Sequence, residues 1–278
     1  MPRIALGLEY DGSGYQGWQS QPISHSVASL QDILQAALSK ISAESIQVVC
    51  AGRTDAGVHA KQQIVHFDTQ ALRPLNAWVR GVNALLPNSM TVIWAQAVPD
   101  NFHARFDAKA RKYVYWLRQS PQKPALSHGQ FGWIHTPLSV DKMRIAAQGL
   151  LGVQDFSSFR SSQCQAHSPI RTLHSLEIHQ PTADLLGFEF EANAFLHHMI
   201  RNIMGALIYV GCGRWTQAEF DAAFAARDRR QSAPTFMPDG LYFLGATYPT
   251  NAKNTENTEN TKTLEIPDYK SAMSVLYE

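Results

Sequence analysis

The order of apolar patterns along this chain limits its possible folds more than any other feature of the sequence. Ile4, Leu6, Leu8 and Tyr10 alternate with a period of two, which predicts one face of a strand. An amphipathic helix is expected over residues 27–41, with Ser26 as its N-cap. Strands are expected at 46–51, 63–67 and 91–98, and a helix at 73–86. This strand–helix–strand–strand–helix–strand order is typical of an α+β unit with helices on one sheet face.

A second part of the chain, starting near residue 106, has a similar inventory. Strands are expected at 112–118, 173–179, 185–192 and 241–247, and helices at 140–151, 195–210 (capped by Asn193) and 217–226. We therefore expect an α+β fold of two similar units, residues 1–105 and 106–250. Each has a largely antiparallel sheet with helices on one face, and the catalytic cleft lies between them. Residues 251–278 begin with a polar, low-complexity run and are expected to be a disordered tail.

Composition indicates a globular protein of the cytoplasm. Hydrophobic residues make up 45% and charged residues 17% of the 278 positions. The three cysteines are odd in number and include no Cys-x-x-Cys pair, which fits a reducing compartment. No apolar run approaches the roughly 20 residues of a membrane helix, so no membrane contact is expected. The net charge is +1, so a site for a polyanion must come from clustered cations.

The stretch Gly52-Arg53-Thr54-Asp55-Ala56-Gly57 follows an apolar run and places one carboxylate between a cation, a hydroxyl and two glycines. A glycine-bounded turn after a strand can hold a reactive side chain both rigid and exposed. Arg53 favours the charged form of Asp55, which a carboxylate nucleophile or base requires. The residue types alone leave a second interpretation open, in which Asp55 only caps the backbone of a tight turn.

Residues 101–118 concentrate five cations and five aromatic side chains. Cations contact phosphates and aromatic faces stack on unpaired bases, which is how proteins recognise single-stranded RNA. The alternative is an ordinary strand with an aromatic core side and a solvated basic side. The glycine loop at residues 11–17 has neither a P-loop lysine nor a dinucleotide fingerprint, so no nucleotide cofactor is expected. Its backbone amides could approach a phosphate, but a flexible turn is the favoured interpretation.

The expected helix at 195–210 is apolar except for a short polar cluster that includes His197, His198 and Arg201. Helical spacing puts Arg201 on a face with the two histidines. An arginine on such a helix needs a partner, and Asp55 is a candidate; the alternative is an arginine of the helix surface. Adjacent helical positions diverge by about 100°, which argues against His197 and His198 as metal ligands.

Several separated motifs occur in a shared order and resemble the tRNA pseudouridine synthase A family over residues 3–248. The motifs are Tyr10-Asp11-Gly12, Gly17-Trp18-Gln19, the Asp55 stretch, and residues 101–106, 111–113, 155–156, 169–172, 195–205 and 240–242. The resemblance implies that uridine is isomerised to pseudouridine at positions 38, 39 and 40 of the tRNA anticodon arm. It also implies a homodimer in which one tRNA contacts both subunits, and no cofactor or metal.

The resemblance further implies a role for individual residues. Asp55 is the nucleophile, Tyr113 stacks on the target base and assists proton removal at its C5, and Arg201 pairs with Asp55. The residues implied in substrate binding are Tyr113, Arg53, His59, Arg105 and Arg111. Two positions depart from the family pattern, because His197 replaces a usual tyrosine and Ala28 a frequent glutamine. The sequence leaves open whether Asp55 attacks the sugar C1′ or the base.

Two other functions compete with this interpretation. A non-catalytic tRNA-binding protein or RNA chaperone would use Asp55 only structurally. A glycosidase needs a second carboxylate, and the nearest ones to Asp55 in sequence are Glu44 and Asp68. A metal nuclease needs clustered carboxylates, which the sequence does not present.

Overall fold

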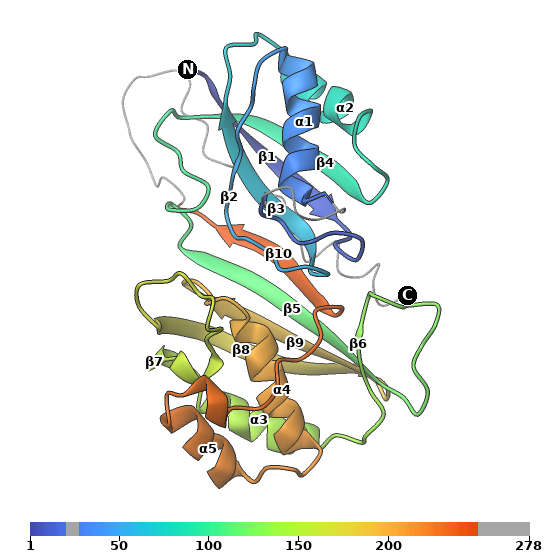
Figure 1. The fold of residues 1–278 in the computed structure, drawn as a ribbon, viewed down its shortest axis with the longest axis vertical. Helices are drawn as coiled ribbons and strands as arrows, with labels where there is room; N and C mark the ends of the chain where they lie inside the picture. Colours follow the sequence, from blue (N-terminus) through green and yellow to red (C-terminus); the bar gives the residue numbers. More distant parts are fainter. Residues whose placement is uncertain (21–27, 250–278) are drawn as a thin grey trace. The chain divides into compact units, whose positions relative to one another are not determined.

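The structure, a computed structural model, describes residues 1–20 and 28–249, which fold into two compact units (Figure 1). The first unit contains Met1–Lys109 and the chain from Tyr242 onward, and the second contains Ala110–Leu241. Ser26 and the tail at residues 251–278 lie outside the described residues.

The first unit is built on a mostly antiparallel sheet. Its elements are β1 (Arg3–Tyr10), α1 (Leu30–Ser42), β2 (Val49–Cys50), β3 (His59–Asp68), α2 (Leu75–Asn83), β4 (Met90–Val98) and β10 (Leu241–Thr247). The strand order is β4-β1-β3-β10, and β2 pairs with β3. β1 runs antiparallel to β3 and β4, whereas β10 runs parallel to β3 with Tyr242 opposite His59. Helices α1 and α2 lie together on one face of this sheet (Figure 1).

Local chemistry explains where these elements begin. The alternating residues of β1 are all buried, as predicted, because β1 lies between two neighbouring strands. Helix α1 begins at Leu30, where the Ser29 hydroxyl accepts a hydrogen bond from the Asp32 N–H (3.1 Å). In the core, Phe67 of β3 meets Trp78 of α2 edge-on with ring centroids 5.2 Å apart, so the helices are anchored to the sheet by aromatic packing.

The second unit also has a sheet with its helices on one face (Figure 1). Its elements are β5 (Ala110–Gln119), β6 (Gly132–Ile134), α3 (Val140–Gln148), β7 (Gly152–Asp155), β8 (Ile170–Thr182), β9 (Leu185–Ala192), α4 (Met199–Gly211) and α5 (Gln217–Ala225). The order β5-β9-β8-β7 is antiparallel throughout, and β6 adds to β5 in parallel. The predicted hairpin of β8 and β9 is confirmed.

Three expectations are corrected by the structure. Helix α4 begins at Met199, and the Asn193 side chain instead accepts hydrogen bonds from the Thr172 and Ala194 N–H groups. His198 precedes the helix with a left-handed φ of 62°, so His197 and His198 are not helical and the spacing argument for them was wrong. The strand at 241–247 pairs with β3 and so lies in the sheet of the first unit.

Among residues 1–20 and 28–249, none of the helices has both the length and the apolar character that a membrane span requires.

Candidate functional site

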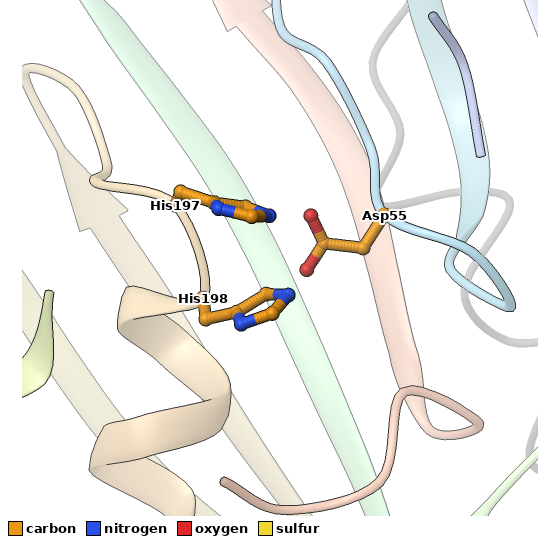
Figure 2. Close-up of side chains that lie close together, drawn as sticks. All are labelled: Asp55, His197 and His198. Carbon is orange, nitrogen blue, oxygen red and sulfur yellow. The ribbon is translucent and has the colours of Figure 1, made fainter. Parts of the chain in front are cut away.

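Asp55 lies on the loop that joins β2 to β3 in the first unit (Figure 2). The Val58 N–H donates to the Asp55 carbonyl (3.1 Å), which closes a four-residue turn. Gly57 occupies the third position of this turn with a φ of 79°, a conformation that glycine adopts without strain. The backbone of the turn is therefore fixed, while the Asp55 side chain is only partly buried.

A buried polar network holds the loop from beneath. The Thr54 hydroxyl lies 2.8 Å from the Tyr10 hydroxyl, and the Gln63 amide donates to the Gly52 carbonyl (2.6 Å). Burial raises the pKa of Tyr10, so its phenol stays neutral, although the hydrogen bonds from Thr54 and Gln63 oppose the shift. These buried hydrogen bonds favour one geometry of the loop, because breaking them would leave further polar groups unpaired.

The glycine loop at residues 11–17 packs directly on the Asp55 loop. The Trp18 N–H donates to the Thr54 carbonyl (3.0 Å). A Cβ at Gly12 would lie 2.0 Å from the Val58 carbonyl oxygen, and one at Gly17 would lie 2.7 Å from the Thr54 carbonyl oxygen. The two loops approach so closely that only glycine fits at these positions. The segment is a turn, as predicted, and its close packing shows that it also supports the Asp55 loop.

His59 is the first residue of β3 and is only 2% exposed. Its ring stacks on Tyr242 with centroids 4.5 Å apart. Its Nδ1 lies 3.2 Å from the Gly12 nitrogen and 3.1 Å from an Asp11 carboxylate oxygen. His59 therefore joins β10, the glycine loop and the end of the Asp55 loop, beneath the surface of the unit.

Arg53 and Arg105 are both exposed and both act electrostatically on the same buried thiol. Burial raises the pKa of Cys50 to about 12, against the opposing effect of the two guanidinium groups. Cys50 ends β2, so both arginines lie near the start of the Asp55 loop. Because burial keeps the Cys50 thiol neutral, this side chain is not a nucleophile.

Arg105 sits on a turn of residues 103–107 that is held by two histidines. The His103 Nδ1 accepts from the Arg105 and Phe106 N–H groups (3.2 and 3.1 Å). The His66 Nδ1 of β3 accepts from the Ala104 N–H (3.1 Å). Burial, together with the nearby Arg3 and His103, lowers the pKa of His66 to about 4. The folded state thus requires a neutral His66.

Acid is expected to destabilise the first unit through His66. In the unfolded chain a histidine titrates near pH 6.5, so below that pH the unfolded state binds a proton that folded His66 does not. The contribution of neutral His66 is full above about pH 6.5 and is lost as the pH falls towards 4. The variant His66→Asn keeps an acceptor that does not titrate, and its urea unfolding midpoint should fall less between pH 7 and 5 than that of the wild type.

The exposed His174 provides the control for this experiment. His174→Asn should keep the pH dependence of the wild type. An equal loss of stability in wild type and His66→Asn would show that His66 is not the acid-sensitive group.

In the second unit, Tyr113 lies in the middle of β5 and is 7% exposed. Its ring meets Phe195 edge-on with centroids 5.1 Å apart, and Phe190 of β9 is its cross-strand partner. The Arg111 side chain, two residues earlier, donates to the Asn193 carbonyl (2.8 Å). Both side chains are thus held by the segment that leads from β9 into α4.

Arg201 lies in the first turns of α4 and is partly buried. Its Nε donates to the Phe236 carbonyl (2.9 Å), and the Phe236 N–H donates back to the Arg201 carbonyl (3.1 Å). Next to it, the buried Asn202 amide accepts from the Thr235 hydroxyl (2.7 Å). These bonds hold residues 235–236 against the helix and fix the stem of Arg201.

His197 and His198 precede α4, and their rings lie side by side with centroids 3.9 Å apart (Figure 2). The His197 N–H donates to the Cys164 sulfur (3.4 Å), and the His197 carbonyl accepts from the Ser161 N–H (3.1 Å). The segment is therefore pinned to the loop after β7. No pattern in the sequence predicted this contact.

In the first unit, Arg53, Asp55 and His59 follow one another directly after β2, and Arg105 acts on the same Cys50 as Arg53. In the second unit, Tyr113 and Arg111 both contact the segment of residues 193–195. The pairing of Arg201 with Asp55 stays a prediction. The two carboxylates nearest to Asp55 in sequence have other partners: Glu44 accepts from Thr69, Gln70 and Ala71, and Asp68 pairs with Arg3 at 2.7 Å.

Comparison with known proteins identifies close relatives. A family model described as tRNA pseudouridine synthase matches residues 8–107 and 146–249. A protein from Bordetella petrii named tRNA pseudouridine synthase A is 55% identical and covers 91% of this chain and 94% of its own length. One of the same name from Chromobacterium violaceum is 56% identical, covering 89% and 93%. The solved archaeal box H/ACA sRNP Nop10–Cbf5 complex matches 74% of this chain and 43% of its own at 15% identity, with a TM-score of 0.35, too weak a likeness to carry an argument.

Proposed function

The chain belongs to the tRNA pseudouridine synthase family, and we propose that it isomerises uridine to pseudouridine at positions 38, 39 and 40 of the tRNA anticodon arm. The observation that carries the proposal is the Asp55 loop. It presents one partly exposed carboxylate on a backbone fixed by a buried polar network and by the glycine loop. A nucleophile needs a side chain that is held in place in this way, whereas a purely structural aspartate does not need it.

The reaction exchanges one bond for another within the nucleotide. The glycosidic bond between C1′ and N1 breaks, the base rotates, and a C–C bond forms between C1′ and C5. C5 gives up its proton and N1 takes one up, so the composition of the nucleotide is unchanged. Asp55 acts as the nucleophile. Tyr113 stacks on the target base and assists removal of the C5 proton. Because the target base lies in a stem or loop, it must be turned out of its stack before these groups can reach it.

Binding of the RNA is assigned to the cations around these groups. Exposed Arg53 and Arg105 contact phosphates near Asp55, and Arg111 does so next to Tyr113. His59 is buried, so its role is to support the Asp55 loop from behind. The protein acts in the cytoplasm as a homodimer, and Asp55 and its neighbours act without a cofactor or a metal.

Arg201→Ala is expected to lower turnover at least about tenfold while changing tRNA affinity less than twofold. The reason is the proposed pairing with Asp55, because an ion pair that keeps the nucleophile charged and oriented acts on the chemical step. Single-turnover rates and tRNA dissociation constants should be measured for the same protein. Arg214→Ala, which removes an exposed arginine stacked over Tyr209, is the matched control. An equal loss in affinity and rate would instead make Arg201 a binding residue.

The proposed activity is tested on an unmodified tRNA transcript with uridine at all three positions. After incubation with and without a chelator, pseudouridine is mapped by carbodiimide-blocked primer extension. We expect new stops in the anticodon arm in both samples. Tight tRNA binding without stops, over several tRNAs, would favour the non-catalytic RNA-binding function. Stops that vanish with the chelator would show that the chemistry depends on a metal.

A further inference from the structure

We propose that Phe106 is a stacking platform for an unpaired nucleobase of the bound RNA, which extends the proposed function to a second base-binding site. Phe106 is a large aromatic side chain, yet 73% of it is exposed. One face of its ring stacks on His103, with centroids 4.2 Å apart and planes 27° apart. Most of the Phe106 side chain is therefore accessible, although its ring packs against His103.

The turn that carries Phe106 is rigid. The Phe106 and Arg105 N–H groups donate to the His103 Nδ1, and the His103 N–H donates to the Asp107 carboxylate (2.7 Å). The Asp107 N–H returns a hydrogen bond to the His103 carbonyl (3.0 Å). Because backbone donors of this turn are bound by its own side chains, the ring is held in place before any ligand arrives, which lowers the entropic cost of binding.

Anchors from β1, from β3 and from the residue after β10 fix this turn to the body of the unit. The Arg3 guanidinium of β1 donates to the Phe102 carbonyl (2.7 Å), and the His66 Nδ1 of β3 accepts from the Ala104 N–H. The Tyr248 hydroxyl, just after β10, donates to the Ala104 carbonyl (2.6 Å). Several hydrogen bonds thus hold an exposed aromatic ring in one position. A ring held in this way is suited to binding a ligand.

The surrounding charge indicates which ligand fits the ring. The Arg105 guanidinium lies over Phe106, 5.7 Å from the ring centroid. Arg105 and Arg53 both act electrostatically on Cys50, in the region where β2 ends. A ring for the base and a cation for its phosphate are the two elements of single-stranded RNA binding. Since this region adjoins the Asp55 loop, the base is one from the unpaired part of the RNA that bears the target uridine.

The experiment uses the inactive Asp55→Ala protein, so that binding is measured without turnover. The probe is an anticodon-arm RNA hairpin with the fluorescent base 2-aminopurine at one unpaired position at a time, and at a paired position as a control. We expect emission to be quenched at one unpaired position. Phe106→Leu should abolish this quenching and weaken tRNA binding about tenfold, whereas Phe106→Trp should retain both.

Leu72 supplies the matched control, because it is another apolar side chain of the same unit and is 92% exposed. Leu72→Ala should leave quenching and affinity unchanged. Unchanged affinity and quenching in Phe106→Leu would contradict the proposal that Phe106 is a stacking platform. An altered oligomeric mass of this variant with unchanged RNA binding would also contradict it, because Phe106 would then be a contact between copies of the protein. If the wild type forms no pseudouridine but the quenching still depends on Phe106, the platform holds and the proposed function fails.

Discussion

Asp55→Ala is expected to lower pseudouridine formation by about four orders of magnitude or more while tRNA affinity stays within about twofold of the wild type. The carboxylate is the one proposed nucleophile, and no neighbouring group can replace it, since Glu44 and Asp68 have partners elsewhere. The fold should not change, because the turn at Asp55 is closed by its backbone and by Gly57. Single-turnover assays with saturating enzyme separate the chemical step from binding.

Asp100→Ala is the control for this result, because it removes an exposed carboxylate of the same unit, 77% exposed, whose ionic partner in the structure is the chain terminus. It should retain wild-type activity and affinity. If Asp55→Ala still formed pseudouridine at more than a hundredth of the wild-type rate, the nucleophile would have to be another group.

Gly17→Ala is expected to reduce turnover about a hundredfold and to destabilise the protein by about 1–3 kcal/mol, although it leaves every catalytic side chain in place. Gly17 has a φ of 88°, and an added Cβ would lie 2.7 Å from the Thr54 carbonyl oxygen and 2.9 Å from the Asp55 carbonyl carbon. The Asp55 loop must shift to admit the methyl group. A displacement of a nucleophile by about 1 Å is enough for a loss of this size.

Gly14→Ala is the matched control within the same loop, because an added Cβ there meets nothing within 4 Å. Its activity and unfolding midpoint should equal those of the wild type. Equal loss in both variants would mean that the loop acts through its flexibility, and no loss in Gly17→Ala would mean that the contact with the Asp55 loop is not needed for catalysis.

Most elements of the fold were predictable because their signals are local. The strand β1 and the hairpin of β8 and β9 were each predicted from the apolar pattern of consecutive residues. The start of α4 was not predictable in this way. Asn193 is a good N-cap residue, but its side chain is used by Thr172 on β8, a partner more than twenty positions away in sequence. Long-range hydrogen bonds of this kind override the local preference for a cap.

In the candidate site, too, local features could be predicted from the sequence and long-range contacts could not. Asp55 and its glycines were recognisable because a turn with a carboxylate has a local signature. The support beneath it was not, since it depends on Gly12 and Gly17 approaching residues some forty positions later. His66 gave no signal either, because only the structure shows that it binds the Ala104 N–H. Such supporting contacts exist only after the strands have paired.

The pairing of β10 with β3 makes the first unit discontinuous in the chain, and this affects how it is made. During synthesis the ribosome releases Asp55 and its glycine loop long before Tyr242, with the whole second unit in between. A nascent chain that has not reached Tyr242 holds the Asp55 loop without the ring that stacks on His59. The second unit is in effect an insertion within the first. The first unit, which carries Asp55, therefore completes its sheet only after the ribosome has synthesised the whole second unit.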